Sequence, residues 1–249
     1  MGDQQQLPQP VEGAHPLDTG LSLLEYYLKE QATIDDDQGI FLNKTFRMHS
    51  TIAEFISESI YEGRLQADPD NDKRVVKRRD PSETEAGIIY LPVVHKNNSQ
   101  ASIEERSAII DLTKKLLGRE KTDKTGKVVG TITMDDILFV APYNLQVSLL
   151  SQELKNEFSV DAKVGSVDKF QGQEEYIVIL SMCTSSEEDI GSRGVDFLFS
   201  LNRLNVALTR AQSLAYVVAS PELVKVRTNN IEKMKSLNFW NRLIKDHRP

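Results

Sequence analysis

The sequence predicts a three-layer α/β fold in which helices cover both faces of a mainly parallel sheet. Short runs of β-branched and aromatic residues alternate with amphipathic stretches, the pattern of strands joined by crossover helices. Four runs are apolar on both faces, as buried parallel strands tend to be: residues 88–94, 137–141, 176–183 and 214–219. The length of 249 residues suits one large α/β domain, or one domain with a short piece of another.

Helices and loops are expected between these strands. Apolar residues recur at helical spacing through residues 52–60, before Gly63, and through residues 109–117, before Gly118. Glycine favours the left-handed conformation that often ends a helix. The stretches 68–85 and 118–130 are polar and rich in charge or in Lys, Thr and Gly. We expect both to be exposed loops or insertions.

Bulk composition excludes several classes of protein. The formal net charge of -7 argues against coating nucleic acid by bulk positive charge, so any such contact needs a local groove. Cys183 is the only cysteine, which excludes an internal disulfide and a cysteine-based zinc site and suits the cytoplasm. No run approaches the roughly 18 apolar residues of a membrane span. The isolated His15 and His49 do not have metal-site spacing, so no metal ligand is expected.

Five segments, in order, carry the chemistry: GDQQQL at 2–7, FRMH at 46–49, APYNLQ at 141–146, VDKFQGQE at 167–174 and RLNVALTRA at 203–211. Their order and spacing resemble superfamily 1 helicases of the 5′-to-3′ branch, which includes the nonsense-mediated-decay helicase and replication nuclease-helicases. In that family they correspond to motif III, motif IV, a short nucleic-acid-facing motif, motif V and motif VI. The resemblance implies a C-terminal RecA-like motor domain at residues 21–249, preceded at 1–20 by the trailing edge of a first motor domain.

The resemblance also implies an ATP site between two RecA-like domains. It assigns Arg210 as the arginine finger, Arg47 as a second arginine on the γ-phosphate, and Gln6 as a sensor of that phosphate. A guanidinium supplied across a cleft stabilises the charge that develops on γ-phosphate oxygens during hydrolysis. Helical spacing of apolar residues in 204–211 predicts that Arg203 and Arg210 share one helical face. The alternative for Arg210 is an ordinary surface arginine.

Further residues are assigned to the nucleotide by the same resemblance. Phe46 stands where the family often has a tyrosine that stacks on adenine; the alternative is a buried core phenylalanine. Glu174 is assigned to the ribose hydroxyls, and Gly172 lets the backbone approach the ligand. Arg203 is assigned as a supporting contact, next to Asn202, where many relatives carry a second arginine.

A third group is assigned to single-stranded nucleic acid, held without reading its sequence. Part of this group follows the strand expected at 137–141, at the edge where open α/β sheets bind ligands. For the tyrosine in the group, packing under its own helix is the alternative. The assigned residues are Pro142, Tyr143, Asn144, Gln146, Ser166, Lys169 and Ser181.

Half of an ATP site is missing from the sequence. The nearest approach to a phosphate-cradling loop, TGKV at 125–128, lacks the upstream glycine and the magnesium-binding hydroxyl. The acidic motif that holds Mg²⁺ is expected just before motif III. We therefore expect a fragment whose Mg²⁺ ligands come from the first motor domain, and which alone does not hydrolyse ATP.

The function expected is that of an ATP-dependent helicase motor half, acting on single-stranded DNA or RNA. The amino-acid sequences of motifs V and VI are most similar to those of bacterial family members that act on DNA and are fused to a nuclease domain. This similarity favours DNA as the substrate and a role in DNA repair. One alternative is a non-catalytic RecA-like module that binds nucleic acid or a partner. Another is a nuclease using Glu104, Glu105 and Asp111, but their helical spacing favours a solvated face.

Overall fold

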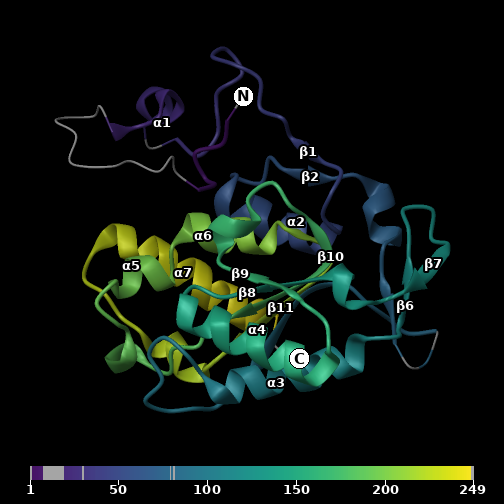
Figure 1. Ribbon diagram of the computed structural model, residues 1–249. Coiled ribbons are helices and arrows are strands. Elements are labelled where there is room, and N and C mark those ends of the chain that lie inside the picture. Colours follow the sequence, from purple (N-terminus) through teal and green to yellow (C-terminus); the bar gives the residue numbers. More distant parts are fainter. Residues whose placement is uncertain (1, 8–19, 30, 79, 81, 248–249) are drawn as a thin grey trace.

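A five-stranded parallel sheet forms the centre of the protein. The computed structural model describes residues 2–7, 20–29, 31–78, 80 and 82–247 (Figure 1). The strand order is β5-β11-β10-β8-β9, and all neighbouring pairs are parallel. The strands are β5 (Gly87–Pro92), β8 (Ile137–Val140), β9 (Lys163–Gly165), β10 (Glu175–Ser181) and β11 (Ala211–Ala219). The four expected strands are confirmed, and β9 is an additional short strand at the sheet edge.

Helices cover both faces of this sheet (Figure 1). Side chains alternate between the faces of a strand, so Val178 and Leu180 of β10 enter one apolar cluster while Ile177 and Ile179 enter the other. The first cluster contains α2 (Ser50–Ile60), α6 (Leu201–Leu208) and α7 (Ile231–Asp246); the second contains α3 (Ile103–Leu116) and α4 (Asn144–Phe158). The predicted three-layer RecA-like fold is confirmed.

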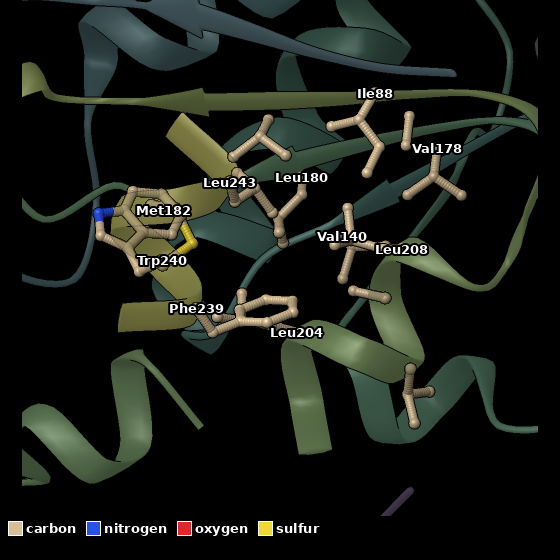
Figure 2. Packing of buried hydrophobic residues seen from close by; sticks show 14 of the residues in the cluster. Ile88, Val140, Val178, Leu180, Met182, Leu204, Leu208, Phe239, Trp240 and Leu243 are labelled. Carbon is tan, nitrogen blue, oxygen red and sulfur yellow. The ribbon is translucent and has the colours of Figure 1, made fainter. Parts of the chain in front are cut away.

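α7, which the sequence patterns did not single out, contributes several large side chains to the first cluster. Figure 2 shows Phe239, Trp240 and Leu243 of α7 beside Met182 and the strand residues. Trp240 is fully buried, and its ring lies 5.4 Å from that of Phe199 between centroids. An aromatic side chain of this size contributes a large share of the apolar area buried in a core.

The two glycines that were expected to end helices lie just after the ends of α2 and α3. α2 ends at Ile60, and Gly63 follows with a φ of +75° and donates its N–H to the Ser57 carbonyl at 2.9 Å. Gly118 follows α3 with a φ of +81°. Gly63 thus satisfies a carbonyl of the last turn of α2, whereas the Gly118 N–H donates to the Ile132 carbonyl at 2.9 Å.

The two stretches expected to be exposed loops or insertions pair with each other in a small sheet of their own, so the loop interpretation is wrong for them. They form an antiparallel sheet of order β4-β3-β6-β7. Val76 is fully buried, and the Thr122 hydroxyl donates to the Lys73 carbonyl at 2.6 Å. Only β3 and β6 bury a side chain, one each, and such a pattern among many charged residues is too weak to detect. The elements are η2 (Pro69–Lys73), β3 (Val76–Lys77), β4 (Thr84–Glu85), β6 (Glu120–Thr122) and β7 (Val128–Thr131).

Short elements complete the chain. α1 (Leu23–Leu28) begins at Ser22, whose side chain accepts from the Glu25 N–H in a capping box. β1 (Lys44–Thr45) pairs in parallel with β2 (Gln66–Ala67). The others are η3 (Met134–Asp136), η4 (Val167–Phe170), η5 (Glu187–Asp189), α5 (Gly194–Leu198) and η6 (Pro221–Lys225). Within the residues described, every helix is too short or too polar to cross a membrane.

Replacing Trp240 by alanine is expected to lower the free energy of unfolding by about 3–5 kcal/mol, because the cavity left in a packed core cannot fully collapse. Met234→Ala, on an exposed part of the same helix, should change it little. Urea denaturation followed by circular dichroism measures both. Equal effects of the two substitutions would contradict the burial of Trp240 in the first cluster.

Candidate functional site

An ion pair joins two of the expected nucleotide residues. Arg47, just after β1, pairs through its Nε with Glu174, just before β10. The Arg47 Nη1 also donates to the Thr209 carbonyl at 3.3 Å, and Gln212 donates to the Glu174 carboxylate at 3.0 Å. Motifs IV, V and VI are therefore brought together at one edge of the sheet.

Arg210 lies in the same cluster and is 4% exposed. Its Nε donates to the Val206 carbonyl and its Nη1 to the Gln173 carbonyl, both at 3.2 Å. Burial lowers the pKa of Arg210 to about 10, and the charge of Arg47 acts in the same direction while Glu174 opposes it. The guanidinium thus stays charged at neutral pH although it is largely desolvated, a state in which an anion is strongly attracted. The surface-arginine alternative is wrong.

The helix around Arg210 ends earlier than the spacing predicts. α6 ends at Leu208, and Arg210 lies between it and β11, which begins at Ala211. The shared helical face of Arg203 and Arg210 is therefore wrong, because Arg210 is no longer on the helix. Ala211, which continues the helical spacing, is instead the buried first residue of β11.

A third arginine, Arg74, was missed by the sequence analysis. Its Nη2 donates to the carbonyls of Phe46, at 3.1 Å, and Arg47. The neighbouring Asn71 is fully buried and donates to the carbonyls of Thr45, at 3.0 Å, and Met48, at 2.9 Å. Burial lowers the pKa of Arg74, an effect that Tyr176 and Glu174 oppose. Arg74 stands among other basic residues of a charged stretch, so the sequence offered no signal for it.

Phe46 is 61% exposed, so the buried-core alternative for it is wrong. The Nζ atoms of Lys44 and Lys124 lie 5.2 Å and 5.7 Å from its ring centroid. Lys124 also donates to the Phe46 carbonyl at 2.7 Å. An exposed ring beside the arginine cluster is able to stack on a planar base. Gly172, with a φ of +81°, is exposed and has open space where a side chain would stand.

The N-terminal segment 2–7 is bound to α6 through its main chain. Asn202 donates from Nδ2 to the carbonyls of Gln4, at 3.1 Å, and Gln6, at 2.6 Å. Asn205 donates in the same way to the Gln5 carbonyl at 2.8 Å. The residue that departs from the family pattern, Asn202, thus holds this segment in place.

The side chain of Gln6 lies against an acidic group of its own segment. It donates to the Asp3 carboxylate at 2.8 Å, which also accepts from the Tyr61 hydroxyl at 2.6 Å. Burial, with the nearby charge of Asp3, raises the pKa of Tyr61, while Arg210 has a smaller opposite effect. Gln6 and Tyr61 therefore bind the same carboxylate. Tyr61 in turn lies near enough to Arg210 for the charge of Arg210 to affect the pKa of its hydroxyl.

Arg203 belongs to a different group of residues. Its guanidinium carbon is 4.3 Å from the Phe197 ring centroid, and its Nη2 is 3.6 Å from the Asp168 carboxylate. With them it lines a hollow that also contains Pro142 and Ser166. The structure thus joins Arg203 to residues that were expected to bind nucleic acid.

Five of the expected nucleic-acid residues follow carboxyl ends of β8 and β9. Pro142 and Ser166 are half-buried, while Asn144 and Lys169 are exposed. Tyr143 is 3% exposed and packs on Phe197 of α5, with ring centroids 5.2 Å apart, so it is buried as the alternative expected, but against α5 rather than its own helix.

The assignment of Gln146 and Ser181 to nucleic acid is wrong, because both side chains are fully buried. The Gln146 amide accepts from the Ser102 N–H at 2.8 Å and donates to the Ser181 hydroxyl at 2.9 Å. Ser181 in turn donates to the Glu105 carboxylate at 2.6 Å. These side chains satisfy one another inside the protein and are not presented to a ligand.

The carboxylates considered for a nuclease do not form a site. Glu104 and Asp111 are exposed, as expected for a solvated face, but Glu105 is fully buried, which corrects that interpretation. Its other oxygen lies 2.9 Å from the His95 Nε2. Among the described residues, no three His, Cys, Asp or Glu side chains gather as metal ligands. His49 caps α2 by accepting from the Thr51 N–H, and His15 lies outside the described residues.

Comparison with known proteins relates most of the chain to helicases. A family model described as an AAA domain matches residues 19–222. DNA polymerase alpha-associated DNA helicase A of Schizosaccharomyces pombe is 29% identical over 231 residues, which are 90% of this chain and 33% of that protein. ATP-dependent helicase upf1 of the same organism is 30% identical over 235 residues, which are 90% of this chain and 24% of that protein. The chain therefore spans about a quarter to a third of the length of these relatives.

Among solved structures, the chain is similar to the C-terminal domain of a possible DNA helicase from Lactobacillus plantarum. The TM-score is 0.38 at 12% identity, and the match covers 72% of this chain and 89% of that one.

Glu174→Gln is expected to lower the free energy of unfolding by about 0.5–1 kcal/mol at neutral pH, the range for a partly exposed charged contact. Partial burial opposes ionisation of Glu174, but hydrogen bonding and the charge of Arg47 hold its pKa below the ordinary 4.5. The loss should thus be complete above pH 4.5 and vanish as the pH falls through the lowered value.

Urea denaturation across this pH range measures the difference. Glu157→Gln is the control, since its side chain is 38% exposed against 39% for Glu174 and pairs with a surface lysine, Lys114, away from the arginine cluster. A Glu174→Gln difference that persists unchanged at low pH would mean that the carboxylate charge is not what stabilises the cluster.

Proposed function

Because this chain belongs to the AAA domain family and is the C-terminal domain of a superfamily 1 helicase of the Upf1-like branch, we propose that it supplies the arginine half of an ATP site. In this proposal residues 21–249 are the second motor domain, and residues 1–20 are the end of the first. The rest of the first domain carries the phosphate-cradling loop and the Mg²⁺ ligands.

The observation that carries the proposal is the gathering of three arginines around one carboxylate. Arg47 and Glu174 form an ion pair, and Arg210 and Arg74 are both desolvated beside them. Three positive charges against one negative charge leave the cluster short of an anion. The phosphates of ATP are the anion that the family implies.

Each residue has a role in this proposal that follows from its contacts. Arg210 and Arg47 stabilise the charge that develops on the γ-phosphate oxygens. Glu174 holds Arg47 in place, and Arg74 fixes the backbone of Phe46 and Arg47 through their carbonyls. The exposed ring of Phe46 stacks on adenine. Mg²⁺, when bound by the first domain, neutralises part of the phosphate charge.

In the same proposal, single-stranded nucleic acid binds at the opposite end of the β-strands from the nucleotide. Pro142 and Ser166 follow the carboxyl ends of β8 and β9, whereas Glu174 and Arg210 precede the amino ends of β10 and β11. Nucleotide and single-stranded nucleic acid, DNA in preference to RNA, thus bind at opposite edges. Closure of the interdomain cleft on ATP moves the domain along the strand, 5′ to 3′ by resemblance.

In the longer protein that carries this chain, Arg210→Ala is expected to lower ATP turnover roughly a thousandfold, the range for an arginine finger. Wild-type turnover should rise on addition of single-stranded DNA, and this 249-residue chain alone should show none. Steady-state ATPase assays measure each rate. Arg242→Ala is the control, because Arg242 lies on α7 and pairs with Glu58 and Asp246.

Two outcomes would contradict the proposal. Unchanged turnover in Arg210→Ala would make that residue structural and move the catalytic cleft elsewhere. Turnover that is absent from the longer wild-type protein, with or without DNA, would favour a non-catalytic module that retains the motifs.

A further inference from the structure

A hairpin outside the parallel sheet reaches the exposed ring of Phe46. Its strands are β6 and β7, which pair in the small antiparallel sheet. The turn between them carries Lys124, whose Nζ donates to the Phe46 carbonyl at 2.7 Å and lies 5.7 Å from the centroid of the Phe46 ring. The hairpin therefore contacts the residue that stacks on the base in the proposed nucleotide site.

Hydrogen bonds within the turn fix the place from which Lys124 extends. The Asp123 carboxylate accepts from the Thr125 N–H at 2.7 Å, from the Thr125 hydroxyl at 2.6 Å and from the Lys127 N–H at 3.2 Å. Gly126 has a φ of +82°, a conformation that glycine adopts without strain. Because the turn is held by its own contacts, only the side chain of Lys124 loses freedom when it reaches Phe46.

The carbonyl of Phe46 accepts from two cations that come from different elements. Arg74, which follows η2, donates to it from Nη2 at 3.1 Å, and Lys124 of the hairpin donates to it at 2.7 Å. A carbonyl oxygen has two lone pairs, so these two donors satisfy it. A rotation of the main chain that turned the Phe46 ring away would break both bonds.

The ion pair next to Lys124 is made by another lysine. Lys44 bonds the Asp68 carboxylate at 2.8 Å; this contact is the largest cause that holds the pKa of Asp68 below its usual value, and Lys124 is a smaller one. Lys124 directs its ammonium instead to Phe46, within the roughly 6 Å over which a cation is attracted to an aromatic face. The ring is still 61% exposed, so room remains for a base to stack on it.

We propose that Lys124 is a positioning residue of the nucleotide site, which holds the main chain and ring of Phe46 in the orientation that stacks on adenine. The inference rests on the proposed helicase function and assigns the β6–β7 hairpin to the ATP site. Lys124 acts through Phe46 in this role. Its loss therefore weakens the binding of ATP and leaves the chemical step at Arg47 and Arg210 unchanged.

Steady-state ATPase assays on the longer protein that carries this chain test the role. Lys124→Met removes the donor and the charge but keeps the length of the side chain. It should raise the KM for ATP about 2- to 12-fold, the range for loss of one hydrogen bond. The kcat should stay at the wild-type value, the split expected when only binding is lost. Lys124→Arg keeps a donor and a positive charge and should restore the KM.

A double-mutant cycle with Phe46→Leu separates positioning from direct contact with the nucleotide. Since Lys124 acts through the ring, Lys124→Met should add no further increase in KM once the ring is absent. Lys127→Met is the matched control, because Lys127 is on the same turn and enters its hydrogen bonds through the N–H. Its KM should equal that of the wild type. Circular dichroism melts check that each variant is folded.

Three results would overturn the positioning role. The first is a wild-type KM in Lys124→Met; if Arg210→Ala still lowers turnover, the helicase proposal stands without the hairpin. The second is an increase in KM that is equally large in the Phe46→Leu background, which would make Lys124 a direct contact of the nucleotide. The third is absence of ATP turnover from the longer wild-type protein, which would remove the helicase proposal and this role with it.

Discussion

Burial of both faces of β10 and β11 is the constraint on which the rest of the structure depends. Because their side chains alternate between two apolar clusters, helices must cover each side of the sheet. Parallel neighbours then require crossover helices such as α6, which return the chain from one edge to the other. Ligand-facing groups are left at the two edges, where strands begin and end.

Desolvation explains why the arginine cluster is held so tightly. A buried guanidinium costs free energy unless acceptors surround it, and here carbonyl oxygens of the chain supply most of them. Arg210 has those of Val206 and Gln173, and Arg74 those of Phe46 and Arg47. These acceptors are neutral, so they fix the positions of the charges without cancelling them. The positive potential remains available to a ligand.

The sequence predicted the sheet well because continuous apolar runs are unambiguous, as residues 176–183 illustrate. Prediction failed where one sequence pattern is compatible with two different structures or environments. Ala211 continues the spacing of α6 but begins β11, and Gln146 and Ser181 are polar yet buried in a shared network. Arg74 was invisible because only tertiary contacts distinguish it from its basic neighbours. The motif residues were identified by resemblance. Which of them lie together, and above all that Arg203 lies with the expected nucleic-acid residues, could be established only from the fold.

The attachment of residues 4–6 has a consequence for sequence variation. Asn202 and Asn205 bind main-chain carbonyls, which every residue type possesses. The side chains at these positions can therefore change through evolution without loss of the attachment. The two asparagines have less freedom, because a residue that replaces either one must still donate a hydrogen bond to these carbonyls. The contact therefore requires donor side chains on α6, but it sets no requirement for the side chains of residues 4–6.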